Sequence, residues 1–170
     1  MARAPHSSGA KTLKGRTVLD SDRHVPYFLT FISNKLSTSA SALYRQRFKI
    51  GVAEWRVISV LASKPGIRAN QVAAYLGTDK GAISRSVQRL DRLGWISLSQ
   101  SENDSRSWTI DLSPAGLAVH DQIIDIALER ERRLLSTLTA DEREVFIRCL
   151  HKLRSAVAAV DRPQAALCSR

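Results

Sequence analysis

Residues 77–113 read GTDKGAISRSVQRLDRLGWISLSQSENDSRSWTIDLS, and this stretch decides the fold. In its first half, apolar residues from Ile83 to Leu93 recur at steps of three and four, which is the period of an amphipathic helix. Thr78 carries the hydroxyl of a typical N-cap, and Gly94 is of the residue type that most often follows a helix. The pattern therefore predicts a helix that begins after Thr78 and ends at Gly94.

The second half of the stretch predicts a hairpin. Apolar and polar residues alternate over 96–99 and again over 108–112, which is the period of half-buried strands, and 101–106 reads as an exposed turn between them. A further short helix is expected over 68–76, just before the first one. Two short helices followed by a hairpin are typical of a winged helix-turn-helix, whose second helix enters the major groove of DNA.

The exposed side of this second helix has the residue types that DNA recognition needs. Burial of its apolar stripe turns the opposite face outward. Together with Thr78, the candidate DNA-binding residues of this helix are Lys80, Gly81, Ser84, Arg85, Gln88 and Arg92. Arginine donates two parallel bonds to guanine and glutamine pairs with adenine, whereas lysine, serine and N-terminal backbone amides hold phosphates. A solvated basic helix face is the alternative interpretation.

Asp104 and Arg106 complete the candidate DNA-binding set at the tip of the predicted hairpin. The carboxylate can hold the guanidinium in an extended pose while the arginine enters a narrow minor groove. An ordinary surface ion pair is the alternative.

The composition fits one core with appendages. The 170 residues are 44% hydrophobic and 25% charged, and the formal net charge of +10 favours a polyanionic partner, either nucleic acid or an anionic membrane. No stretch reaches the roughly 20 apolar residues that span a bilayer, and residues 1–22 lack the apolar core of a signal peptide. We therefore expect a cytoplasmic protein with no membrane partner.

Four further helices are expected around the central stretch. One runs from Pro26 to before Gly51 and another over about 53–62. Ser113 and Pro114 form a cap and first turn for a helix to about residue 137, and Thr139-Ala140-Asp141-Glu142 matches the capping box of a last one. Residues 1–24 show neither helical nor strand periodicity and are interpreted as a basic, irregular tail.

Residues 25–160 resemble the MarR (multiple antibiotic resistance regulator) family of bacterial transcription factors. The segments that carry the resemblance are Glu54-Trp55-Arg56-Val57, Asp79-Lys80-Gly81-Ala82-Ile83-Ser84-Arg85, Asp104-Ser105-Arg106 and Leu112-Ser113-Pro114-Ala115-Gly116. The resemblance implies a mainly α fold with a small β-hairpin wing, in which the first, fifth and sixth helices interlock with a second copy. Two-fold symmetry then implies a pseudo-palindromic operator in double-stranded DNA, with half-sites about 10 base pairs apart.

These expectations divide the chain into regions. They are an N-terminal tail over 1–24, a helical dimerisation region over 25–50 and 113–160, a winged helix-turn-helix domain over 51–112, and a C-terminal tail over 161–170. The first and last helices offer more apolar surface than one small winged domain can cover, which agrees with a homodimer. A helical core formed within one chain is the alternative.

The resemblance also implies a small-molecule effector, often aromatic or carboxylate-bearing, in a cleft between the dimer helices and the winged lobe. The candidate lining residues are Phe28, Trp55, Arg56 and His120. All four are equally interpreted as ordinary packing residues. Such a regulator acts as a repressor that the effector relieves, or as an activator.

Other chemistries find little support in the sequence. Cys149 lies on an apolar helical face and is interpreted as a small core residue, and Cys168 lies in the tail, so we expect reduced thiols. The histidines His6, His24, His120 and His151 are scattered, so we predict no metal and no cofactor. Catalytic motifs are absent, and the competing function is a sequence-tolerant architectural DNA-binding protein.

Overall fold

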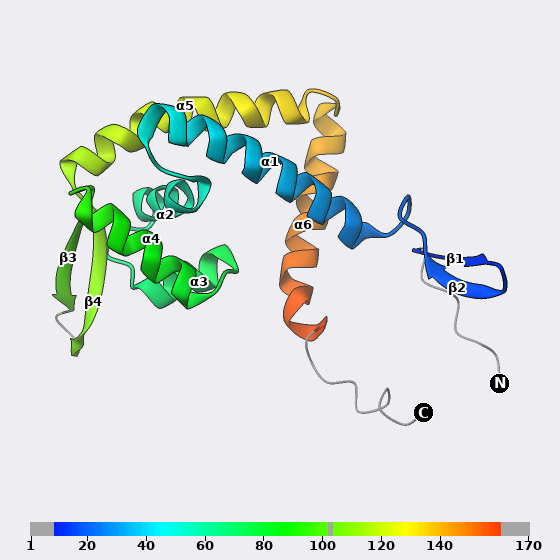
Figure 1. Cartoon of the computed structure of the whole chain (residues 1–170), viewed down its shortest axis with the longest axis horizontal. Helices are drawn as coiled ribbons and strands as arrows, with labels where there is room; N and C mark the ends of the chain where they lie inside the picture. The colour runs from blue at the N-terminus through cyan, green and yellow to red at the C-terminus, as the bar shows by residue number, and fades with distance from the viewer. Residues whose placement is uncertain (1–8, 102–103, 161–170) are drawn as a thin grey trace. The chain divides into compact units, whose positions relative to one another are not determined.

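The computed structural model describes residues 9–101 and 104–160, with the side chains from 101 to 107 outside the described part. Figure 1 shows the order of the elements. They are β1 (Ala10–Leu13), β2 (Arg16–Leu19), α1 (Val25–Phe48), α2 (Val52–Ser63), α3 (Ala69–Leu76), α4 (Lys80–Arg92), β3 (Ile96–Ser101), β4 (Asp104–Leu112), α5 (Pro114–Leu135) and α6 (Ala140–Val160). The predicted mainly helical fold with a two-stranded wing is confirmed.

The chain divides into two compact units, residues 1–122 and 123–170, and α5 crosses the boundary between them. In the first unit, α3 and α4 pack together and β3 follows beside α4 (Figure 1). Residues from α2, α3, α4 and the wing make the core of this lobe. Its most deeply buried side chains include Val57, Ile58, Leu61, Val72, Leu90 and Ile110.

The wing is longer than the sequence predicts. The backbone of β4 begins at Asp104, and its pairing with β3 runs from Ile96 opposite Leu112 to Ser101 opposite Asp104, with an irregularity after Gln100. Alternation of residue type is visible only over the inner half of the hairpin, where one face meets the core. The outer half is polar on both faces, so its sequence reads as a turn.

Residues 112–116, with the sequence Leu-Ser-Pro-Ala-Gly, form the junction between the winged lobe and α5. The Ser113 hydroxyl donates to the Gly94 carbonyl (2.7 Å) and accepts from the Gly116 amide (3.1 Å), so it caps α5 and connects this helix to the turn after α4. A Cβ at Gly116 would lie only 1.9 Å from the Trp95 carbonyl oxygen. Glycine is therefore required for this close approach.

The N-terminal segment differs from the irregular tail that the sequence predicts. Residues 10–19 form the hairpin β1–β2, which leads into α1 (Figure 1). Its two-residue turn places Lys14 and Gly15 at φ of 47° and 73°, as a type I′ turn requires. The strands are short and mostly exposed, so they lack the apolar alternation by which a strand is recognised. Lys11 holds the Asp20 carboxylate at 3.0 Å and keeps the pKa of that carboxyl below its ordinary value.

In the second unit, α6 begins with the predicted capping box. The Thr139 amide donates to the Glu142 carboxylate (2.8 Å), and the Thr139 hydroxyl accepts from the Glu142 amide (3.3 Å). This pairing lowers the pKa of the Glu142 carboxyl. No residue of α6 is buried in the single chain, so the interpretation of Cys149 as a core residue is wrong for the monomer: its side chain is exposed. Among the described residues, no helix is long and apolar enough to cross a membrane.

Candidate nucleic-acid interface

Helix α4 is built as an amphipathic helix with a strong N-terminal cap. Asp79, not the predicted Thr78, is the N-cap, because its carboxylate accepts from the Ala82 amide at 2.8 Å. Both residue types are good caps, and the one nearer the first helical turn is used. The helix buries Ile83, Ser86, Val87 and Leu90. The candidate DNA-binding residues Lys80, Gly81, Ser84, Arg85, Gln88 and Arg92 are all exposed, as is Thr78 just before the helix.

The long side chains of α4 lie along an open groove. A hollow of about 440 Å³ is lined by Ala53 and Glu54 of α2 and by Ala82, Arg85, Ser86, Gln88, Arg89 and Arg92 of α4. An Arg85 guanidinium nitrogen would lie 3.4 Å from a Cβ at Gly81, so this side chain extends toward the N-terminus of the helix. Arg92 Nε donates to the Gln88 carbonyl at 3.3 Å. The groove is therefore a positively charged surface with bidentate donors.

Arg89 is a groove residue that the sequence prediction omitted. Its Nη2 donates to the main-chain carbonyl of Lys49 at 2.5 Å, which connects α4 to the end of α1. The spacing of four from Arg85 is the signal that places it on the same side of the helix. The helical pattern alone does not show that its guanidinium is bound to another helix.

The wing is held to the lobe at its base. The Ile110 amide donates to the Ile67 carbonyl (2.9 Å), and the Asp111 carboxylate accepts from the Gly66 amide (2.6 Å). The predicted contacts of Asp104 and Arg106 concern side chains outside the described residues, so they stay predictions. The backbone of both residues belongs to β4, the second strand of the hairpin that follows α4.

The four candidate effector residues are only partly brought together. The Trp55 and His120 rings stack with centroids 5.7 Å apart, and Trp55 also meets Tyr44 edge-on at 6.0 Å. Arg56 Nη2 donates to the Ser37 hydroxyl at 2.9 Å. Phe28 is exposed, and it lies roughly 24 Å from Tyr44 along the axis of α1. Packing thus accounts for the placement of Trp55, and a shared cleft with Phe28 stays a prediction.

A small cavity lies between the helices of the lobe. It measures about 60 Å³ and is lined by Ala53, Arg56, Leu76, Thr78, Ala82, Ile83 and Ser86. This volume is well below the roughly 150 Å³ of an apolar cavity that binds benzene. In the described part of the chain, no group of three or more histidine, cysteine or carboxylate side chains is placed to hold a metal ion.

Two short helices, the second of them capped and with an exposed basic face, and a hairpin directly after it define a winged helix-turn-helix protein. Comparison with known proteins identifies the family within this class. The model of the MarR family matches residues 48–107. The crystal structure of a MarR/EmrR family transcriptional regulator from Acinetobacter sp. ADP1 is 34% identical, with a TM-score of 0.78, and the match covers 83% of this chain and 99% of that one. The chain belongs to the MarR family of transcriptional regulators.

Two other similar proteins extend this comparison. The HTH-type transcriptional regulator PecS from Dickeya dadantii (strain 3937) is 24% identical over 100 residues, which are 57% of this chain and only 60% of PecS. The structure of the S. aureus MepR-DNA complex has a TM-score of 0.71 at 23% identity, over 79% of this chain and 97% of that one. At this identity the MepR match shows a shared fold.

Proposed function

We propose that this protein is a homodimeric, sequence-specific DNA-binding transcription regulator that places α4 of each subunit in a major groove. One observation carries the proposal: α4 buries Ile83, Val87 and Leu90 on one side and exposes Arg85, Gln88 and Arg92 along one open groove. These side chains are long, polar and suited to base edges. The similar MepR protein was solved as a DNA complex, which supports the same use of the shared fold.

The homodimer is supported by exposed apolar surface. In the single chain, the first half of α1 exposes Val25, Tyr27, Phe28, Leu29, Phe31, Ile32 and Leu36. Along α6, the exposed apolar residues are Val145, Phe146, Ile147, Leu150, Leu153, Val157 and Val160. A monomer rarely leaves so much apolar surface in water. A second copy of the same helices covers it by symmetry.

For the biological role, we propose repression of a target promoter in the cytoplasm, relieved by a small effector. A structure of the similar PcaV regulator from Streptomyces coelicolor holds that protein's natural ligand, which supports effector control in this fold. A ligand releases DNA only by binding better to the conformation that does not fit the operator. We propose no catalytic role and no cofactor.

The test is selection of bound duplexes from a random DNA pool by the purified full-length protein at a stated salt concentration. The proposal predicts an enriched pseudo-palindrome with half-sites about 10 base pairs apart. Salt-sensitive binding with no enriched motif would instead identify an architectural protein that holds the phosphate backbone. An enriched single half-site would contradict the dimer.

A further inference from the structure

Arg89 connects α4, the proposed DNA-reading helix (the reader), to the end of α1. It lies in the C-terminal half of α4, and its Nη2 donates to the carbonyl of Lys49 at 2.5 Å. The two residues are 40 positions apart in the sequence and lie in the same compact unit. The acceptor is a main-chain carbonyl, so the hydrogen bond from the guanidinium constrains both the distance between α4 and the end of α1 and their relative orientation.

The acceptor is held rigidly in place. Lys49 is the C-cap of α1 and has a left-handed backbone with φ of 61°, which is unusual for a residue with a side chain. Ile50 is fully buried, and the Gly51 amide donates to the Glu54 carboxylate at 2.8 Å at the start of α2. The last carbonyls of a helix lack partners within it, so a cationic donor is favourable at this position.

We propose that Arg89 is a positioning residue for DNA recognition. It fixes the rotation of α4 against the corner between α1 and α2, so that Arg85 and Gln88 meet base edges, and it makes no phosphate contact of its own. The inference rests on the proposed function of α4 as the reader. Because α1 belongs to the proposed dimerisation region, the same bond transmits the orientation of that region to the reader.

Two replacements of Arg89 by side chains of similar length distinguish the effect of the hydrogen-bond donor from that of the apolar stem. Arg89→Lys retains a cation that donates to the same carbonyl, whereas Arg89→Met retains the apolar stem without a donor. The binding of each full-length variant to the selected operator and to a scrambled duplex is measured over a range of salt concentrations, with unfolding in urea as the check on folding.

We expect Arg89→Met to weaken operator binding about tenfold, with Arg89→Lys close to the unaltered protein. Binding to scrambled DNA and the salt slope stay the same for both variants. A loss of about 1.8 in the slope of the dimer, which is about 0.9 for each phosphate contact, would show that Arg89 contacts DNA and would overturn the inference.

Two further outcomes would also overturn it: operator binding by Arg89→Met equal to that of the unaltered protein, or Arg89→Lys as weak as Arg89→Met. The unaltered protein supplies the separate test of the proposed function in the same experiment. If it fails to prefer the operator over scrambled DNA, the proposed function is wrong and the inference fails with it. If it does prefer the operator, the variants test only the positioning role of Arg89.

Discussion

Single residues of α4 separate into those that build the helix and those that face outward. Asp79 caps the first turn and Leu90 is fully buried, whereas the side chains of Arg85 and Gln88 are exposed. A long cationic side chain on an exposed helix face contributes little to folding. The proposed role of these exposed residues in recognition therefore predicts that their replacement changes DNA binding more than stability.

Replacement of Arg85 by alanine is predicted to weaken operator binding by about 1–3 kcal/mol, which is the value of one bidentate contact with a base. Binding to scrambled DNA is expected to change much less, because a base contact contributes little there. Quantitative binding to both duplexes at one salt concentration checks this. Equal losses on the two duplexes would mean that Arg85 contacts phosphate and carries no specificity.

Gly116→Ala is predicted to destabilise the fold by about 1–3 kcal/mol or more, because the new Cβ would stand 1.9 Å from the Trp95 carbonyl oxygen. Helix propensity alone predicts the opposite sign, a gain of up to about 1 kcal/mol for alanine over glycine. The free energy of unfolding in urea distinguishes the two. A more stable variant would show that α5 does not approach the lobe so closely.

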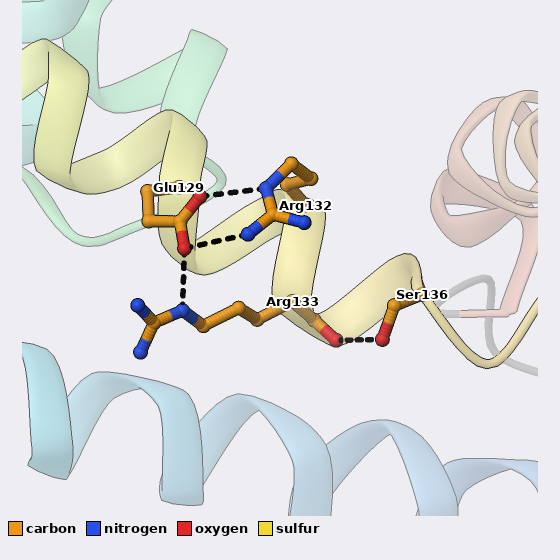
Figure 2. A network of polar contacts seen from close by, with 4 residues as sticks. All are labelled: Glu129, Arg132, Arg133 and Ser136. Carbon is orange, nitrogen blue, oxygen red and sulfur yellow. Dashed lines mark hydrogen bonds and ion pairs between the residues drawn. The ribbon is translucent and has the colours of Figure 1, made fainter.

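The C-terminal half of α5 is stabilised by a local ion cluster, which Figure 2 shows. The Glu129 carboxylate accepts from Arg132 at 2.6 and 2.8 Å and from Arg133 at 2.5 Å. The hydrogen bond from Arg132, followed by that from Arg133, lowers the pKa of Glu129 from 4.5 to about 2. The same pairing raises the pKa of Arg132. The spacings of three and four residues place all three side chains on one side of the helix.

We predict that the Glu129 carboxyl titrates near pH 2 in the folded protein. Because its pKa is lower when folded, the unfolded chain binds the proton more readily, so the cluster stabilises the fold above about pH 4.5 and loses this contribution as the pH falls toward 2. The cluster is exposed, so salt should weaken the effect. Carboxyl NMR titration of the protein and of Glu129→Gln checks the assignment, and an ordinary pKa at low salt would contradict the cluster.

The wing hairpin β3–β4 follows α4 along the chain, and the backbone of Arg106 belongs to its second strand. Arg106→Ala is predicted to weaken DNA binding and to make its salt dependence shallower, because an arginine in the minor groove displaces cations there. Binding isotherms over a range of salt concentrations measure both quantities. An unchanged affinity and slope would remove the wing from the interface.

Sequence patterns predict those elements in which apolar residues recur regularly along the whole buried face. The buried row from Ile83 to Leu90 predicts α4, and Ser113-Pro114 predicts the start of α5. The strands of residues 10–19 were missed because both faces of that hairpin are mostly exposed, so no alternation marks them. The bond from Arg89 to Lys49 joins residues far apart in the sequence, and a helical period carries no information about such a contact.

At the scale of the whole molecule, α6 is amphipathic in sequence but buries none of its residues within one chain. We predict a dimer of the unaltered protein in sedimentation experiments and dissociation of Leu150→Asp, because burial in an apolar interface would remove the hydration of the new carboxylate. The same variant should lose operator affinity, since each half-site would be bound alone. Glu144→Gln, an exposed change on the same helix, is the control. A dimer that survives Leu150→Asp unchanged would place the interface elsewhere.

The central claim is that the protein reads DNA sequence, and the ratio of its affinities for the selected operator and for a scrambled duplex of equal length tests this most directly. Both affinities are measured at one salt concentration near the physiological value. The account predicts a preference of about a thousandfold or more for the operator. Equal affinities would contradict it and would show that the basic groove of α4 holds the DNA backbone without regard to sequence.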